Sequence, residues 1–153
     1  MMLTGILRAL FSSLTASWGF AVLLHAPSRS WLPASIIGGI SFTLYWICFS
    51  LGVPDPASVF LSALAGSILA QLFARRLHMI ATVFITLSIV PMVPGLGLYR
   101  CMEYLAQGQS DAGVQTFTAA MVTIVMLALG IGVGGYLFHL AAGQRANRKD
   151  GSL

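Results

Sequence analysis

Apolar residues along the chain gather into five long runs separated by short polar connectors. The runs extend over residues 3–24, 31–51, 57–74, 77–106 and 114–140. Each is close to or above the ~20 residues that a helix needs to cross the hydrocarbon of a bilayer. The connectors HAPSRS, GVPDP, RRLH and QGQSDAG are too short to hold a soluble domain. The pattern predicts an all-α, polytopic membrane protein, a single domain over residues 1–153 built as a bundle of about five transmembrane helices.

The composition also requires a lipid environment. Hydrophobic residues make up 58% and charged residues 8% of the 153, whereas soluble domains carry roughly a quarter charged residues. Such a chain cannot cover itself with polar surface, so lipid must be its solvent. The first apolar run is interrupted by SSLTAS and no small-residue cleavage site follows it, so we expect a retained helix and not a secretory signal.

The fourth run contains helix breakers in the stretch SIVPMVPGLGLYR, where Pro91, Pro94 and Gly95 stand among apolar residues. Proline removes a backbone donor and its ring clashes with the preceding turn, so a helix must break here. At 1.5 Å per residue the parts on either side, residues 77–90 and 96–106, would be roughly 21 Å and 16 Å long, too short for either to cross alone. We therefore expect one transmembrane helix broken at Pro91 to Gly95, whose two halves cross together.

Basic residues are unevenly divided between the two sides of the predicted bundle. If the five runs alternate in direction, Arg8 and Arg100 fall on the side of the N-terminus. Six basic residues fall on the other side: Arg29, Arg75, Arg76, Arg145, Arg148 and Lys149. The positive-inside rule then places the N-terminus outside and the C-terminus in the cytoplasm. A re-entrant hairpin at the break would put the RR and RANRK groups on opposite faces, so the charge distribution favours a broken crossing.

A helix break inside a bilayer leaves backbone groups without partners, and lipid cannot satisfy them. Such breaks are tolerated where they are buried in protein or line a wet cavity, and discontinuous helices recur at the substrate sites of secondary transporters. Proline and glycine are also common in membrane helices as simple kinks. The residues alone leave both interpretations open, a substrate site or a packing kink.

The stretch VPMVPGLGLY, in a chain of about five apolar runs with a short basic tail, resembles the P-x-x-P-G signature of the threonine/serine exporter (ThrE) family. The chain is most similar to the small YjjB-like subunit type of that family. The resemblance implies a subunit of a secondary exporter in the bacterial inner (cytoplasmic) membrane. Its substrate would be a small amino acid such as threonine or serine, or a dicarboxylate such as succinate. Carried over by position, the family's signature falls on Pro91, Pro94 and Gly95, the residues of the break that are candidates for substrate binding.

The resemblance also implies a partner. Full-length members of the family carry two such bundles and a hydrophilic N-terminal region on one chain, and this chain has one bundle. We therefore expect a larger ThrE-type (YjjP-like) membrane subunit as partner, with a homo-oligomer as the other arrangement. The alternative function is a non-transporting membrane assembly or stabilising subunit, in which the break is only a kink.

Few other polar residues offer chemistry. Arg100 can present a bidentate fork to a substrate carboxylate, although a snorkelling arginine near the outer interface, paired with Glu103, is the favoured interpretation. Asp55 and Asp111 fall in connectors and are interpreted as solvated turn residues. The histidines and cysteines have spacings that match no metal motif: His25, His78, His139, Cys48 and Cys101. With no nucleophile and base at recognisable spacing and no basic aromatic patch, the sequence predicts no enzyme, no metal or cofactor, and no nucleic-acid partner.

Small residues recur at a spacing of four in two of the runs. Ser62, Gly66 and Ala70 lie four apart, as do Gly130 and Gly134. Small residues at this spacing let helix backbones approach closely, which is how membrane helices pack. We expect these faces to pack helices within the chain and, because the chain lacks a second bundle, to contact another chain as well.

Overall fold

The computed structural model describes residues 2–150, with side chains described for residues 5–90 and 92–141. Its elements are α1 (Met2–Leu23), α2 (Ser28–Ser50), α3 (Asp55–Leu77), α4 (Ala81–Ile89), the 3₁₀ turn η1 (Val90–Met92), α5 (Gly95–Ala106) and α6 (Ser110–Asp150). Four of them, α1, α2, α3 and α6, are long and apolar enough to cross a membrane. Together with the interrupted pair α4 and α5 they form the expected bundle. The all-α, polytopic membrane fold is therefore confirmed.

Prolines and glycines in the connectors fix where the helices start and stop. Pro27 and Pro54 directly precede α2 and α3, with φ of −54° and −53°. The fixed φ of proline suits the start of a helix, where its missing amide hydrogen is not needed. Gly52 and Gly108 have φ of 85° and 74°, a left-handed conformation that glycine adopts at little cost, and they close the turns after α2 and α5. Since the connectors are short, consecutive long helices pack as neighbours.

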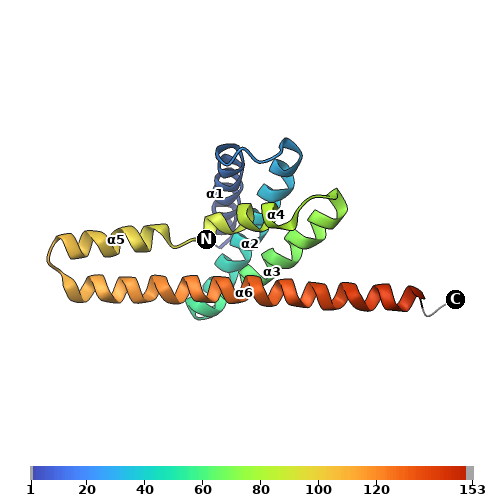
Figure 1. Ribbon diagram of the computed structural model, residues 1–153. Helices are drawn as coiled ribbons and strands as arrows, with labels where there is room; N and C mark the ends of the chain where they lie inside the picture. The colour runs from blue at the N-terminus through green and yellow to red at the C-terminus, as the bar shows by residue number, and fades with distance from the viewer. Residues whose placement is uncertain (1, 151–153) are drawn as a thin grey trace.

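The first four helices share one apolar core near the connectors that follow α1 and α3. Its buried members come from all four helices: Ala21, Ala34, Ile37, Ala70, Ala74, Phe84 and Leu87. The α1–α2 connector also meets α4, because His25 and Pro27 line the same cavity as Thr82 and Leu87. The end of α1 and the end of α3 therefore lie at one end of the bundle (Figure 1), as alternating crossings require.

Helices α3 and α6 pack on each other and run in the same general direction, at an angle to each other (Figure 1). Gly130 of α6 packs on Phe60 of α3, and further along both helices the guanidinium of Arg75 lies 5.1 Å from the ring centroid of Phe138. Between α3 and α6 the chain turns back as two short helices joined at the break, because α4 leads from the end of α3 to η1, which lies beside Ser62 near the start of that helix.

The two half-helices pack against different parts of the chain. Helix α4 packs within the shared core, whereas α5 packs mainly on α6, with Gly97 facing Ala120 and Leu105 facing Gly113. Figure 1 shows α5 and the first part of α6 as an antiparallel hairpin that extends beyond α1, α2 and α3. The tight turn at Gly108 folds α5 back onto α6 and forces this pairing. The hydropathy pattern does not indicate such a division.

The small residues singled out in the sequence lie at contacts between the chain's own helices. A Cβ added to Gly130 would lie 2.7 Å from the Phe60 carbonyl oxygen, and one added to Gly134 would lie 2.8 Å from the Leu64 carbonyl oxygen. Fully buried Ser62 faces η1, and Gly66 faces Ser41 of α2. Contacts within the chain therefore account for Ser62, Gly66, Gly130 and Gly134. Contact of a second chain with these faces stays a prediction.

Candidate substrate site at the helix break

The backbone at PMVPG ends one helix and starts the next. Helix α4 ends at Ile89, and the single turn of η1 follows with Pro91 near its start. Val93 is extended, with φ of −63° and ψ of 128°, and Pro94 directly precedes α5 with φ of −76° and ψ of 54°. Without an amide hydrogen, Pro94 cannot donate to a helix that runs through from α4. A new helix therefore begins at Gly95.

Met92 packs the break against α3 and α6. Its side chain is buried and packs with Val59 and Ala63 of α3 and with Leu127 of α6. The hydroxyl oxygen of Ser62 lies 3.8 Å from the Met92 sulfur. Since Val59 and Ser62 belong to the first two turns of α3, the break lies near the start of that helix and not halfway along it.

A cavity of about 400 Å³ lies beside the break. Its walls come from α2, α3, η1, α5 and α6, through Phe42, Tyr45, Asp55, Val59, Met92, Pro94, Leu96 and Thr123. The volume falls within the roughly 300–1,000 Å³ that is usual for small-molecule sites, and a mostly apolar wall with a few polar groups is also usual there. The cavity is therefore suited to a small ligand with one or two polar groups.

Asp55 is the charged residue of this cavity. It lies in the first turn of α3, where the helix dipole stabilises a carboxylate, and the hydroxyl of Tyr45 donates a hydrogen bond of 2.6 Å to its Oδ1. Asp55 also lines a neighbouring cavity of about 520 Å³, to which α6 contributes Gln115 and Thr118. Thr123 lines both cavities, so Asp55 and Thr123 stand between them.

A family model described as Threonine/Serine exporter, ThrE, matches residues 9–136, which is most of the chain. The chain belongs to the threonine/serine exporter family. No curated protein and no solved structure matches it. The matched range includes the break and every residue that lines the cavity beside it. The family is one of transporters and not a class of enzymes, and the four helices that can span a membrane agree with a multi-pass transport protein.

In this member of the exporter family, only part of the site expected from the sequence comes together. Pro94 lines the cavity, and neighbouring Gly95 is exposed, with nothing within 4 Å of an added Cβ. The side chain of Pro91 lies outside the described residues. Arg100 is exposed further along α5 and is not among the residues that line the cavity. It forms no ion pair with Glu103, which is also exposed in the described part of the chain.

The sequence pattern does not point to Asp55 and Tyr45. It places Asp55 in a connector and offers no reason to single out one tyrosine among the aromatic residues. The two are ten residues apart on different helices, and only the short α2–α3 turn brings them together. A signal is nevertheless present, because Asp55 is one of only four acidic residues and stands between Pro54 and Pro56 at the start of a helix.

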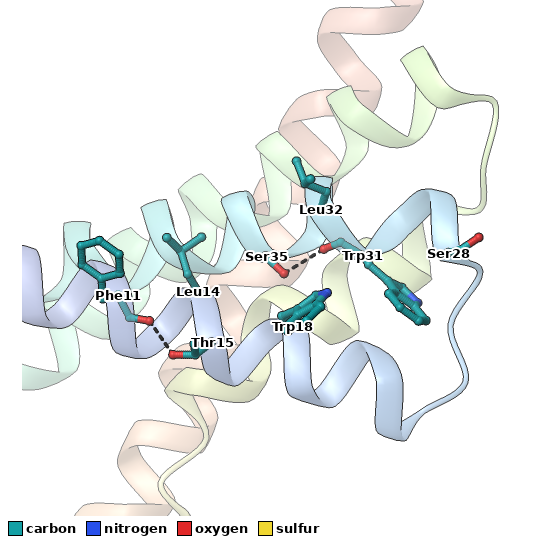
Figure 2. Close-up of a pocket in the computed structure, with 8 residues that line it drawn as sticks. All are labelled: Phe11, Leu14, Thr15, Trp18, Ser28, Trp31, Leu32 and Ser35. Atoms are coloured by element: carbon teal, nitrogen blue, oxygen red, sulfur yellow. Dashed lines mark hydrogen bonds between the residues drawn. The ribbon is translucent and has the colours of Figure 1, made fainter.

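A larger hollow, of about 510 Å³, lies between α1 and α2 (Figure 2). Phe11 and Trp18 give it an apolar lining. The hydroxyls of Thr15 and Ser35 donate to backbone carbonyls of their own helices, those of Phe11 and Trp31. No charged residue lines this hollow, whereas Asp55 lines the cavity at the break, so the cavity at the break suits a small polar ligand better. The candidate substrate site is therefore the cavity at the break.

Proposed function

We propose that this chain is a subunit of a secondary exporter of small amino acids, threonine and serine, and that the cavity beside Pro94 lies on the substrate path. The observation that carries the proposal is the position of the break. In a chain of the threonine/serine exporter family, the break borders a cavity whose wall holds a carboxylate and two hydroxyls. A break that served only as a kink would be packed on all sides. Here Met92 is packed, whereas Pro94 and Leu96 face the cavity.

The start of α5 provides chemistry for a substrate carboxylate. The first amides of a helix have no carbonyl partner within it, and the helix dipole adds partial positive charge there. Leu96 in this first turn lines the cavity, and Gly95 leaves the backbone uncovered. The Gly95 amide already donates to the Val93 carbonyl oxygen at 2.7 Å, so a carboxylate would bind the next two amides, those of Leu96 and Gly97, without a buried side-chain cation. Arg100, further along α5, would attract the substrate toward the site and not hold it there.

The exporter would be completed in the bacterial inner membrane by a larger ThrE-type (YjjP-like) subunit, or by a second copy of the chain. Tyr99 and Met102 on α5 are 65% and 73% exposed, so this face of α5 is open to such a contact or to lipid. The proposed orientation has the N-terminus outside and the C-terminus in the cytoplasm, following the distribution of basic residues. A dicarboxylate such as succinate is the alternative substrate.

Efflux from preloaded cells tests the proposal. Cells that express the chain together with the larger subunit should export labelled threonine faster than cells with either subunit alone. The Pro94→Ala variant should insert and assemble normally but export more slowly, because an alanine amide lets the helix partly re-form across the break. Full export by Pro94→Ala and by Gly95→Leu would favour the other function, a non-transporting assembly subunit whose break is only a kink.

A further inference from the structure

The cavity at the break contains a charged group that the proposed function leaves without a role. Asp55 lines this cavity and also the neighbouring one of about 520 Å³. Glu103 and Asp111, the other acidic residues with described side chains, line neither. Asp55 therefore presents an exposed carboxylate to both cavities, on a chain that carries few charges.

This carboxylate is held in place by a neutral partner. The Tyr45 hydroxyl donates to Oδ1 of Asp55 at 2.6 Å. The Tyr45 ring packs between Phe42 and Phe49, with centroid distances of 5.8 Å and 6.2 Å. An ionised carboxylate has about four acceptor positions, so the tyrosine orients the group and leaves acceptor positions for a ligand. A hydroxyl donor also leaves the negative charge in place, so the ligand that fits is a cation.

We infer that Asp55, oriented by Tyr45, binds the ammonium group of the substrate, which is a small zwitterionic amino acid and not a dicarboxylate. The inference rests on the proposed function, which places the substrate carboxylate at the start of α5. Asp55 and Leu96 line one cavity, so its walls hold both an acidic group and the amino end of a helix. An amino acid matches both charges. A dicarboxylate would bring a second negative charge toward Asp55, and like charges repel.

Equilibrium binding to the purified protein, with its larger subunit where the two co-purify, tests this assignment. The probes are labelled threonine, labelled succinate and ethanolamine, which has an ammonium group and no carboxylate. Asp55→Asn keeps an acceptor for Tyr45 and removes the charge. Asp111→Asn is the matched control, because it makes the same change in the first turn of another helix, outside both cavities.

Asp55→Asn should weaken threonine and ethanolamine binding at least tenfold, and Asp111→Asn should change neither. Asp55→Glu should recover part of the threonine affinity, and Tyr45→Phe should weaken it a few-fold by releasing the carboxylate. If the Asp55→Asn variant binds threonine as tightly as the wild-type protein does, the inference is wrong. It is also wrong if the wild-type protein binds succinate more tightly than threonine.

Two further results distinguish an ammonium site from a proton-coupling site, and substrate binding from export. If Asp55→Asn keeps its threonine affinity but loses the pH dependence of efflux, Asp55 serves a coupling proton and the ammonium assignment is overturned. If the purified protein binds threonine and ethanolamine through Asp55 while cells export no threonine, the ammonium site stands and the proposed export function fails.

Discussion

Alanine at Gly130 should weaken the contact between α3 and α6. The added Cβ would lie 2.7 Å from the carbonyl oxygen of Phe60, 2.8 Å from the Cβ of Ala63 and 3.1 Å from the amide nitrogen of Leu64. The carbonyl oxygen and the amide nitrogen are backbone atoms of a regular helix, which cannot turn aside as the end of a flexible side chain would. The two helices must therefore move apart or slide along each other to make room.

The magnitude follows from two opposing terms. Overpacking of this kind costs about 1–3 kcal/mol, whereas exchanging glycine for alanine in a helix by itself stabilises the fold by about 0.5–1 kcal/mol. Gly132, on the same helix, isolates the first term because an added Cβ there meets nothing within 4 Å. Since the helix term is common to both variants, Gly130→Ala should be less stable than Gly132→Ala by about 1–3 kcal/mol.

Unfolding in mixed micelles, followed by the loss of native near-ultraviolet circular dichroism as SDS is added, measures this difference from the transition midpoints. Gly134→Ala should repeat the loss of stability one turn along, because its Cβ would lie 2.8 Å from the Leu64 carbonyl oxygen. Equal stability of the Gly130→Ala and Gly132→Ala variants, or greater stability of Gly130→Ala, would refute the close packing of α3 on α6.

The orientation of the chain and the open space at Gly95 are tested separately. With Cys48 and Cys101 replaced by alanine, exposed Ser50→Cys at the end of α2 should react with a membrane-impermeant thiol reagent from the periplasm. Exposed Ser28→Cys at the start of α2 should react only after permeabilisation, and the opposite pattern would reverse the proposed orientation. Gly95→Ala should keep the unfolding free energy within about 0.5 kcal/mol of the wild type, because its Cβ meets no protein atom within 4 Å. It should slow threonine efflux, because the added methyl group covers backbone that Gly95 leaves open at the proposed site. Unchanged efflux would remove the Gly95 backbone from the proposed site.

Hydropathy and proline chemistry were sufficient to predict the helices and the break. The apolar runs 31–51 and 57–74 correspond to α2 and α3, and the break at Pro91 to Gly95 corresponds to η1 and the start of α5. These features depend on local properties, the length of an apolar run and the missing amide hydrogen of proline. The end of α6 was harder to predict. The helix continues to Asp150, well past the apolar run, because hydropathy reports where lipid contact ends and not where the helix ends.

The candidate site could not be predicted in the same way, because it depends on which helices meet. The bond between Tyr45 and Asp55 requires α2 and α3 to turn back on each other, and the cavity requires α5 and α6 to lie beside them. The spacing of Gly130 and Gly134 correctly indicated a face for close packing. A spacing of four residues identifies a helix face but carries no information on whether a neighbouring helix of the same chain or another protein covers it.

Helix α3 connects the packing of the bundle to the candidate site. Its first turn carries Asp55, Val59 holds η1 through Met92, and the next turns pack on Gly130 of α6. Helix α5 lies outside this framework, since it packs mainly on α6 and joins η1 through an extended segment and not through a continuous helix. In secondary transporters, access alternates when one part of the protein moves against another around a fixed site. Within the proposed export cycle, we therefore expect α5 to form the wall that moves and α3 to keep the carboxylate in place.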